Sequence, residues 1–534
     1  MKNTIPEPIP QPSAVEISAF YYPGTEQMAE WDQVEQTLPH IKPLLGWYDE
    51  GNPEVIDWQI KWAVEHGISS FCVDWYWNRG VQRLDHWVKA FYKANFRKYL
   101  KWYMMWANHN EIGAHSTEDQ INVTRFWIDN YFKTPEYYTI DGKPVVVIWS
   151  RDNLDRDFRA EAGTKGEVLA PGEGVKRALQ LTDKMVRDAG LPGVYFIEMY
   201  HSTQYEQELF NSSKTAGFRG QMVYNFREIA FRLTPPEELA PEDNAKNFPF
   251  DFMVNSAIKW WEMTSKDNAF PFWPIIPTGW DDRPRSFQLA RIVRGRTVGK
   301  FKAICQKCRQ FCETHNIKRV IISPLNEWQE GSYIEPNEEF GFGMYDALRD
   351  VFCTPPTEGF PPNLTPASLG LGPYDYPPME HPRRTSWVFS DDVQGWYRNP
   401  YGTAHIRIAD NALRFFRSGQ DKPAIRTRIQ PFDSAQFRKF LIRMKITPNQ
   451  GFPPAGDEKM TLFWGTPECP VISKELVLNN DSTISTTVQA DGEFHEYSLE
   501  LTVHPNWKGM VEELWLDPIP LPLAYIDIQW MRFE

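Results

Sequence analysis

Two glutamates, Glu327 and Glu330, follow a short run of β-branched residues with only an indole and an amide side chain between them. That run, residues 319–322, has the apolar character of a buried strand. Cleavage of a glycosidic bond needs one carboxylic acid to protonate the leaving oxygen and a second carboxylate to act as base or nucleophile. Burial and mutual repulsion would raise the pKa of one member enough to keep its proton near neutrality. The spacing therefore indicates a carboxyl pair for chemistry on a sugar.

Other interpretations of these acids are open. The stretch could instead be a capping box at the start of the next helix, with Asn326 as the N-cap. Glu335, the third acid of this stretch, is expected to shape the loop. A metal site would need ligands such as Asp74, His109, Glu198 and Asp281, but no H-x-H or H-E-x-x-H spacing supports one. We therefore expect neither a metal ion nor another cofactor.

Strand-like and helix-like segments alternate from residue 16 to residue 353, with eight of each. Strict alternation predicts parallel strands joined by right-handed crossovers, and eight units close most naturally into a (β/α)8 barrel. An open doubly wound sheet is the alternative, but no glycine-rich nucleotide-binding turn follows the first strand. The predicted strands cover residues 17–22, 68–73, 100–106, 144–149, 194–200, 221–225, 272–277 and 319–322.

Active sites of such barrels lie at the carboxyl ends of the strands. Polar and aromatic residues gather at those predicted ends, and their concentration favours a substrate-binding rim. For any single residue, a cap or a loop hydrogen bond is the competing explanation. The candidate substrate-binding residues are Tyr22, Asp74, Trp75, Tyr76, Trp77, Trp106, His109, Asn110, Glu198, Tyr200, Trp280, Asp281 and Asn326.

The texture of the sequence changes after the barrel, which we place at residues 1–353. Residues 354–383 are rich in proline and glycine and are predicted to form an extended linker. Residues 384–534 show short period-2 strands separated by turns, which is typical of an antiparallel β-sandwich. Its aromatic residues could form a carbohydrate-binding face or a core, and they include Trp387, Trp396, Tyr397, Tyr401 and Trp464.

The composition of the chain limits the classes of binding partner that we expect. The 534 residues carry a net charge of −13 and no basic run, so we expect neither nucleic acid nor an anionic membrane as a partner. The sequence contains no stretch of about 18 apolar residues, which is the length needed to span a membrane, so we expect no membrane-spanning helix. The amino terminus lacks the apolar core of a signal peptide, which favours the cytoplasm, or the periplasm or exterior if a leader has been removed. Cys305, Cys308 and Cys312 fit one helix face better than a zinc site. The oligomeric state stays open.

Several motifs resemble a known group. The run Asn326–Gly331, with Tyr333-Ile334-Glu335-Pro336 behind it, resembles the N-E-W-x-E-G motif of glycoside hydrolase family 99 and of the related WbsX-like proteins. The stretches 21–23, 67–71 and 74–77 are similar to the same group. The resemblance covers residues 16–353 and does not include the sandwich, which departs from the basic family 99 enzyme.

The resemblance implies a retaining (β/α)8 enzyme related to endo-α-mannosidases, with oligo- or polysaccharide as its substrate. It implies that Glu327 assists the 2-hydroxyl of the sugar through a 1,2-anhydro intermediate and that Glu330 is the acid/base. The expected function is hydrolysis of an α-linked mannoside, rhamnoside or related glycan. A non-catalytic glycan-binding protein and a glycosyltransferase of a polysaccharide gene cluster are the alternatives, although no nucleotide-sugar site is visible in the sequence.

Overall fold

The chain divides into two compact units, which are described separately: Met1–Asp281 with Arg291–Pro377, and Pro378–Glu534 with Asp282–Ala290. In the described part of the chain, no helix is both long and apolar enough to cross a membrane. The computed structural model describes residues 4–24, 28–78, 80–108, 113–200, 207–224, 226–233, 239–266, 270–286, 290–377, 384–398, 403–417, 424–448, 454, 456–472, 478–479, 481–519 and 524–534.

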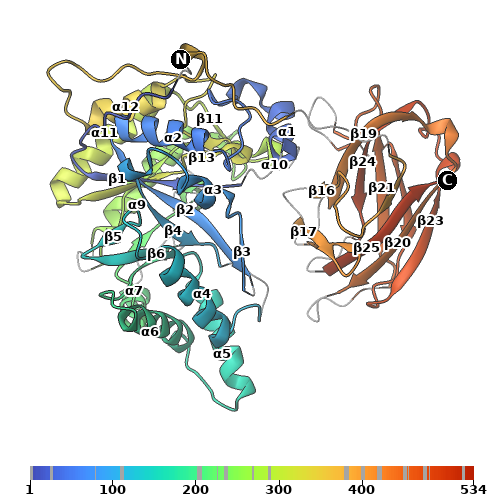
Figure 1. Cartoon of the computed structure of the whole chain (residues 1–534), viewed down its shortest axis with the longest axis horizontal. Coiled ribbons are helices and arrows are strands. Elements are labelled where there is room, and N and C mark those ends of the chain that lie inside the picture. Colours follow the sequence, from blue (N-terminus) through green and yellow to red (C-terminus); the bar gives the residue numbers. More distant parts are fainter. Residues whose placement is uncertain are drawn as a thin grey trace. The chain divides into compact units, whose positions relative to one another are not determined.

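The first unit is built on a ring of eight parallel strands (Figure 1), so the predicted barrel is confirmed. Neighbours pair in the order β10-β12-β1-β2-β4-β6-β7-β8. Backbone hydrogen bonds of Gln221 with Pro271 (2.9 Å) and Trp273 (3.3 Å) join β8 to the segment that leads into β10 and close the ring. The strands are β1 (Glu16–Tyr21), β2 (Ile68–Asn78), β4 (Lys101–Trp106), β6 (Lys143–Ile148), β7 (Tyr195–Met199), β8 (Gly220–Met222), β10 (Ile275–Pro277) and β12 (Arg319–Ser323).

Helices cover the outside of the ring. All eight predicted helices are present, and α1, α5 and α8 were not expected from the sequence. The helices of this unit are α1 (Met28–Thr37), α2 (Pro53–Glu65), α3 (His86–Phe91), α4 (Thr117–Asn130), α5 (Arg151–Thr164), α6 (Glu173–Asp188), α7 (Gln207–Ala216), α8 (Phe226–Leu233), α9 (Phe250–Thr264), α11 (Val298–His315) and α12 (Gly343–Phe352). Short strands β3 (Val81–Arg83), β5 (Thr139–Ile140), β9 (Asn247–Pro249) and β11 (Ile292–Arg294) lie outside the ring.

Local sequence explains where these helices begin and end. Asn52 caps α2 by accepting the backbone N–H of Glu54 at 3.0 Å, and Pro53 occupies the first turn. Gly67 follows α2 at φ +85°, where an added Cβ would lie 2.5 Å from the sulfur of Cys353. On α11, Cys305, Cys308 and Cys312 are buried in the barrel core.

The segment predicted as a linker belongs to the barrel unit up to Pro377. The indole N–H of Trp62 donates to the carbonyl of Leu364 at 2.8 Å, and that of Trp58 donates to the hydroxyl of Tyr374 at 3.0 Å. Proline-rich backbone is extended and keeps its carbonyls free, so it can accept hydrogen bonds from a neighbouring helix while its apolar side chains pack. Composition alone predicted an extended segment but not its docking on α2.

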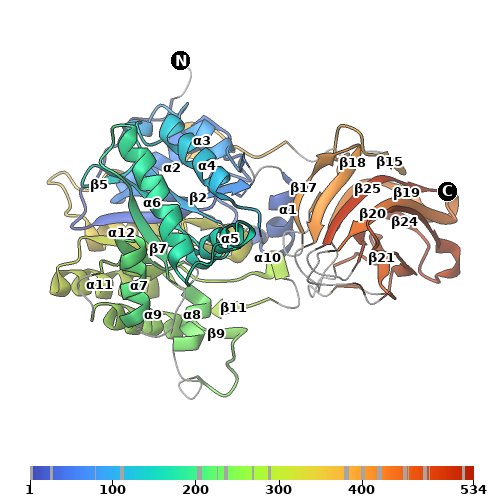
Figure 2. The same cartoon turned by 90° about the horizontal axis from the view of Figure 1, so that it is seen from below.

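The second unit is the predicted antiparallel β-sandwich, made of two sheets (Figure 2). One sheet has the order β17-β18-β25-β20-β23 with β15 beside β25, and the other has the order β16-β19-β24-β21-β22. The strands are β15 (Ser386–Val388), β16 (Tyr397–Arg398), β17 (Thr403–Ala409), β18 (Ala412–Arg417), β19 (Ile425–Asp433), β20 (Lys439–Thr447), β21 (Lys459–Gly465), β22 (Thr483–Thr487), β23 (Phe494–Glu500), β24 (Met510–Asp517) and β25 (Ala524–Phe533). Helix α10 spans Arg283–Ser286.

The sandwich tryptophans considered for a binding face lie in its core. Trp387 meets Trp396 edge to face at 5.6 Å between ring centroids, and both are at most 1% exposed. Trp464 is fully buried, and Tyr397 lies under the guanidinium of Arg426 at 4.7 Å. Tyr401 lies outside the described residues. Of the two sequence interpretations, the core is the one that these contacts support.

Candidate active site

Glu327 and Glu330 lie on a tight hairpin at the carboxyl end of β12. Strands β13 (Asn326–Glu327) and β14 (Ser332–Tyr333) pair antiparallel around a single 3-10 turn, Trp328–Glu330. We call residues 326–333 the glutamate hairpin. Gly331 turns it at φ +56°, and an added Cβ there would lie 2.6–2.9 Å from atoms of Asp281. Glycine at this position therefore lets the hairpin approach the loop that follows β10.

Asn326 ties the glutamate hairpin to the end of β1. Its side-chain oxygen accepts the backbone N–H of Tyr22 at 2.9 Å, and its amide donates to the Tyr22 carbonyl at 3.1 Å. Leu325 adds a backbone bond to Phe20 at 2.8 Å. The 3-10 turn has no side-chain cap. The capping-box interpretation therefore does not describe this structure, in which Asn326 positions the hairpin.

Three carboxyl groups and a phenol gather around this hairpin. The hydroxyl of Tyr224, just after β8, donates to Oε1 of Glu327 at 2.8 Å. Asp74 in β2 lies close enough to Glu327 and Glu330 to interact electrostatically with their negative charges. The exposed fractions are 4% for Asp74, 6% for Glu327 and 9% for Glu330. Residues from β2, β8 and β12 thus meet at the carboxyl end of the barrel.

This crowding changes the protonation of Asp74. Burial raises its pKa well above the usual range, the charges of Glu327 and Glu330 raise it further, and a hydrogen bond with Tyr224 opposes the shift. Burial and the same three carboxyl groups also raise the pKa of Tyr224. The group therefore combines a carboxyl that holds its proton with neighbouring glutamates, which is the mixture that acid–base chemistry requires.

Several other predicted site residues lie next to this group. Tyr22 is half-buried, and its ring covers Gly24, where an added Cβ would overlap it. Tyr76 is half-buried and lies two positions after Asp74, on the same face of β2. The backbone N–H of Asp281 donates to the carbonyl of Glu330 at 2.7 Å.

Two further predicted residues lie near the same barrel end. The guanidinium groups of Arg227 and Arg291 both lie over the ring of Trp280, each 5.7 Å from its ring centre. Tyr200 is buried just after β7, and its backbone N–H donates to Met222 in β8 at 2.8 Å.

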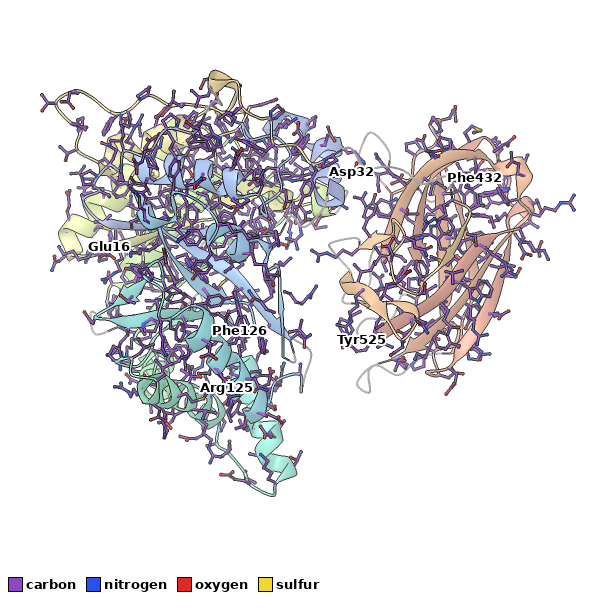
Figure 3. All side chains as sticks on the ribbon, viewed as in Figure 1. Glu16, Asp32, Arg125, Phe126, Phe432 and Tyr525 are labelled. Carbon is purple, nitrogen blue, oxygen red and sulfur yellow. The ribbon has the colours of Figure 1, made fainter. Side chains whose placement is uncertain are left out.

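The three tryptophans Trp75, Trp77 and Trp106 pack against α4 instead. Trp75 and Trp77 stack at 5.8 Å, and both contact Phe126 of α4, which Figure 3 labels. The indole N–H of Trp77 donates to Asp119 of α4 at 3.1 Å. Trp106 meets Trp127 edge to face at 5.3 Å and is fully buried. Because side chains alternate along a strand, Trp75 and Trp77 face away from Asp74.

Glu198 is also separate from the glutamate hairpin. It shares a face of β7 with Phe196, which borders a pocket beside α6 and α7. It lies 3.6 Å from Arg151, which also donates to Ser213 of α7 at 2.7 Å. Burial raises its pKa, while Arg151 and Ser213 lower it. These contacts indicate a buried ion pair between β7 and α5, and not membership of the carboxyl group around the glutamate hairpin.

The remaining predicted residues, His109 and Asn110, lie outside the described part of the chain. Sequence reasoning missed Tyr224 and Trp149, whose rings meet edge to face at 5.7 Å. Both follow barrel strands, so the strand-end rule that selected the other residues could have found them. In the described residues, no group of three His, Cys, Asp or Glu side chains is arranged to hold a metal ion.

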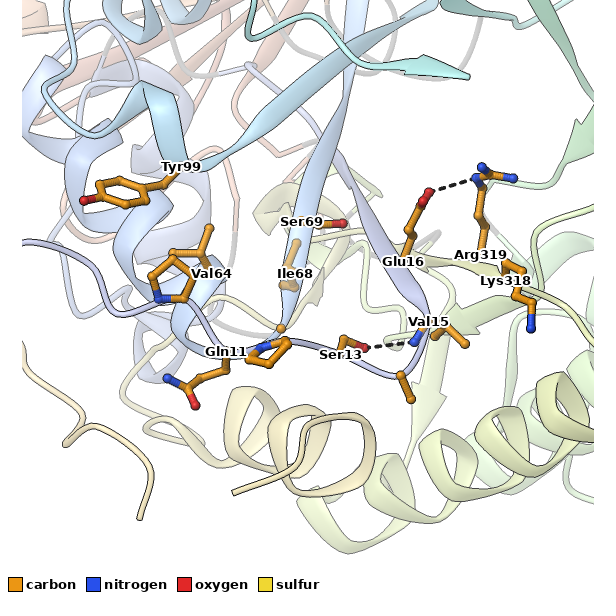
Figure 4. Close-up of a pocket in the computed structure, with 14 residues that line it drawn as sticks. Gln11, Ser13, Val15, Glu16, Val64, Ile68, Ser69, Tyr99, Lys318 and Arg319 are labelled. Atoms are coloured by element: carbon orange, nitrogen blue, oxygen red, sulfur yellow. Dashed lines mark hydrogen bonds and ion pairs between the residues drawn. The ribbon is translucent and has the colours of Figure 1, made fainter. Parts of the chain in front are cut away.

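The opposite end of the barrel carries a different kind of pocket. It has a volume of about 530 Å³ and is lined by residues 10–16, by the turn from Val64 to Ser69, and by Tyr99, Lys318 and Arg319 (Figure 4). The carboxylate of Glu16 pairs there with Arg319 at 2.8 Å. This pocket lies at the amino ends of β1, β2 and β12, where barrel residues usually serve stability.

Comparison with known proteins gives distant relatives. The chain is 22% identical over 400 residues to "Uncharacterized protein WxcX" of Xanthomonas campestris pv. campestris (strain B100), covering 66% of this chain and 51% of the relative. It thus spans about half the length of the curated relatives it matches. Among solved structures, a "Glycoside hydrolase-like protein" aligns with a TM-score of 0.45 and 16% identity, over 66% of this chain and 98% of that one.

A second solved structure is the GH99 endo-alpha-mannosidase from Bacteroides thetaiotaomicron. It aligns with a TM-score of 0.40 and 16% identity, over 63% of this chain and 96% of its own. The sequence model of a family described as "Glycosyltransferase WbsX" matches residues 28–348, a span that begins with α1, ends within α12 and includes the whole glutamate hairpin. The chain therefore belongs to the WbsX family.

Proposed function

We propose that this protein is a glycoside hydrolase that cleaves an α-linked glycan with Glu327 and Glu330. The observation that carries the proposal is the group of three buried carboxyls, Asp74, Glu327 and Glu330, joined by Tyr224 at the carboxyl end of the barrel. Burial of several acids beside one another costs stability, and proteins retain such arrangements mainly where they do chemistry. Glycoside cleavage is a reaction that uses paired carboxyls of this kind.

In the proposed reaction, Glu327 takes the proton of the sugar 2-hydroxyl while the 2-oxygen attacks C1. The bond from C1 to the leaving oxygen breaks, and Glu330 gives its proton to that oxygen. Glu330 then takes a proton from water as the water attacks C1, the bond from C1 to the 2-oxygen breaks, and Glu327 returns its proton to that oxygen, so the product retains its anomeric configuration and both glutamates regain their starting states. Tyr224 donates a hydrogen bond to Glu327 and orients it toward the 2-hydroxyl.

This route limits the substrate class. The 2-oxygen must attack C1 from the side opposite the leaving group, so the two oxygens must be trans. In α-mannosides and α-rhamnosides the 2-hydroxyl is axial and trans to the axial glycosidic oxygen. We therefore propose an α-mannoside, α-rhamnoside or related glycan as the substrate, and assign Asp74, with its raised pKa, the role of a neutral hydrogen-bond donor.

The test is hydrolysis of a panel of α-linked mannans and rhamnans, followed by proton NMR of the first product anomer. Release of the α-anomer is expected for the wild-type protein. Release of the β-anomer would exclude the anhydro route, because a single displacement inverts the configuration. A panel with no turnover under any condition would favour a glycan-binding protein that keeps the cleft without catalysis.

Glycosyl transfer is the second candidate, because the matched family carries the description of a glycosyltransferase. The same carboxyl pair could release a sugar to an acceptor hydroxyl instead of water. The two functions differ in the donor: a transferase that uses a nucleotide sugar should be stabilised by it, whereas a hydrolase should be stabilised by oligosaccharide. Thermal midpoints with guanosine and uridine diphosphate sugars, and with mannan oligosaccharides, separate the two.

A further inference from the structure

A chain of buried hydrogen bonds starts from the residue that lies between the two glutamates of the hairpin. The indole N–H of Trp328, between the two glutamates, donates to the hydroxyl of Tyr48 at 3.2 Å. That hydroxyl donates to Oε2 of Glu335 at 2.6 Å, and the amide of Gln59 donates to Oε1 of Glu335 at 2.8 Å. None of these four side chains is more than 3% exposed.

The directions of these bonds depend on the ionisation of Glu335. A tyrosine hydroxyl has one proton, which Tyr48 gives to Glu335 while its oxygen accepts the N–H of Trp328. Gln59 must present its amide to Glu335, because its oxygen accepts the hydroxyl of Tyr21 at 3.0 Å. Both oxygens of Glu335 therefore act as acceptors, and a proton on either one would oppose a donor of Tyr48 or Gln59.

We propose that ionised Glu335 is a positioning residue, which holds Trp328 through Tyr48 and thereby fixes Glu327 and Glu330, and that protonation of Glu335 releases this hold. The role as a positioning residue rests on the function proposed above, whereas the hydrogen-bond chain itself does not. Glu335 acts on the hairpin through Tyr48 and Trp328, and its own hydrogen bonds reach neither Glu327 nor Glu330.

The stacking of the indole of Trp328 explains why its single hydrogen bond matters. The ring of Trp328 stacks on Tyr333 at 4.4 Å, with 21° between the planes, and Arg296 lies over the far side of Tyr333 at 4.2 Å. Stacking holds the plane of the indole but lets it slide, and the N–H bond to Tyr48 sets its position within that plane. Loss of the bond frees the turn that carries both glutamates.

The surroundings of Glu335 place its titration near neutrality. Burial raises its pKa to about 7, with help from the charge of Glu50, against the hydrogen bonds from Tyr48 and Gln59 and a smaller effect of the nearby indole of Trp328. The other titratable groups that face it are Tyr21 on β1 and Tyr345 on α12, and His86 pairs with Glu50 at 3.3 Å. The tyrosines stay neutral over this range, because burial raises their pKa values.

The experiment is amide hydrogen exchange by mass spectrometry on the full chain, at pH 6 and pH 8, corrected for the intrinsic exchange rates. The reporter peptide covers residues 326–335, and the peptide of α11 is the internal reference for global unfolding. The variants are Glu335→Gln and Tyr48→Phe. Asp57→Asn is the matched control, because Asp57 is also a buried carboxylate, on α2, but accepts from Phe96 at 2.8 Å and Asn95 at 3.0 Å.

In the wild type, exchange of the reporter peptide should rise about fivefold or more from pH 8 to pH 6, with no change in α11. Glu335→Gln should exchange fast at both pH values, and Asp57→Asn should follow the wild type. Tyr48→Phe keeps the carboxylate and should also exchange fast at both, which preserves the test if Glu335→Gln does not fold. Equal protection of the wild-type hairpin at both pH values, or wild-type protection in folded Glu335→Gln or Tyr48→Phe, would overturn the proposal.

Activity supplies a second readout once a substrate is known. Glu335→Gln should lower kcat about tenfold or more with little change in KM, and the acidic limb of the wild-type pH profile near pH 7 should disappear. An unchanged pH profile would contradict the positioning role. A wild-type protein without turnover would instead contradict the proposed function, and the exchange experiment would still decide whether Glu335 holds the hairpin.

Discussion

The barrel mouth and the sandwich both bury carboxyl groups, but they stabilise them differently. In the sandwich, Asp527 is 2% exposed and lies 2.5 Å from Arg414 and 3.2 Å from Lys445. In the barrel mouth, the charges that act on Asp74 are those of two further acids, Glu327 and Glu330. A buried acid beside a base forms a structural ion pair, whereas buried acids gathered together repel one another when ionised, so that at least one of them favours its protonated form. The charge of the neighbouring groups therefore distinguishes the candidate active site from structural ion pairs more clearly than the burial of the acid does.

Glu198 tests this distinction within the barrel itself. It follows the same strand-end rule as Asp74, yet it pairs with Arg151 as Asp527 pairs with Arg414. The comparison therefore assigns Glu198 to the structural class.

The largest effect is expected from Glu330→Gln or Glu327→Gln, each of which should lower kcat by about a thousandfold or more. Each change removes a proton-transfer group while keeping the shape of the side chain, so the thermal midpoint should stay nearly unchanged. Glu198→Gln is the matched control and should keep kcat within about threefold of the wild type. Steady-state kinetics on one glycan and thermal melts check all three, and normal activity in either hairpin variant would refute the assignment.

Tyr224→Phe should lower kcat/KM by about ten- to a hundredfold. It deletes only the hydroxyl that donates to Glu327 at 2.8 Å and leaves the ring packed against Phe20 at 4.6 Å. Kinetics measured on the purified variant give the result. Wild-type turnover in this variant would place Tyr224 among the packing residues.

Asp527→Asn should destabilise the sandwich by about 2 kcal/mol, because it removes the charge that Arg414 and Lys445 share. Turnover per folded molecule should not change. Denaturant unfolding measures the effect. Asp410→Asn is the control: Asp410 pairs with the same Arg414 at 3.0 Å but is exposed, so less than about 0.5 kcal/mol is expected. Equal effects of the two variants would contradict the comparison.

Asp74→Asn should show the opposite pH dependence from a salt-bridged acid. A folded-state pKa above the ordinary value means that this group stabilises the fold below its ordinary pKa, and that the contribution is lost as pH rises through the raised value. Asparagine cannot ionise, so the variant should gain stability relative to the wild type between about pH 4 and pH 8. Urea unfolding at both pH values measures the gain. If the variant and the wild type differed in free energy of unfolding by the same amount at both pH values, Asp74 would not be protonated in the folded protein.

Much of the barrel could be predicted from the sequence. Strict alternation located all eight strands of the ring, and the position of Glu327 and Glu330 after the last strand placed the pair at the carboxyl end of β12. The docked segment up to Pro377 was not predictable, because proline-rich composition is the same for a free linker and for an extended chain that packs on a helix. The tryptophan contacts of Leu364 and Tyr374 distinguish the two.

The rim residues show where sequence reasoning ends. The period of two along β2 means that Trp75 and Trp77 share one face and Asp74 and Tyr76 the other, and this follows from the sequence alone. Which face turns toward the barrel interior depends on how α4 packs, through Phe126 and Trp127. The strand-end rule alone therefore selects adjacent residues equally as candidate site residues, although their side chains lie in opposite environments.

By itself, the sequence determined the order of the elements, the strand ends and the acids that follow β12, because these depend on local periodicity and spacing. Only the tertiary structure decided which acids meet one another and which meet a base. Asp74, Tyr224 and Glu327 are far apart in the chain and come together through closure of the ring, as do Tyr48, Gln59 and Glu335. Protonation depends on such long-range neighbours, since burial and charge act through space rather than along the chain.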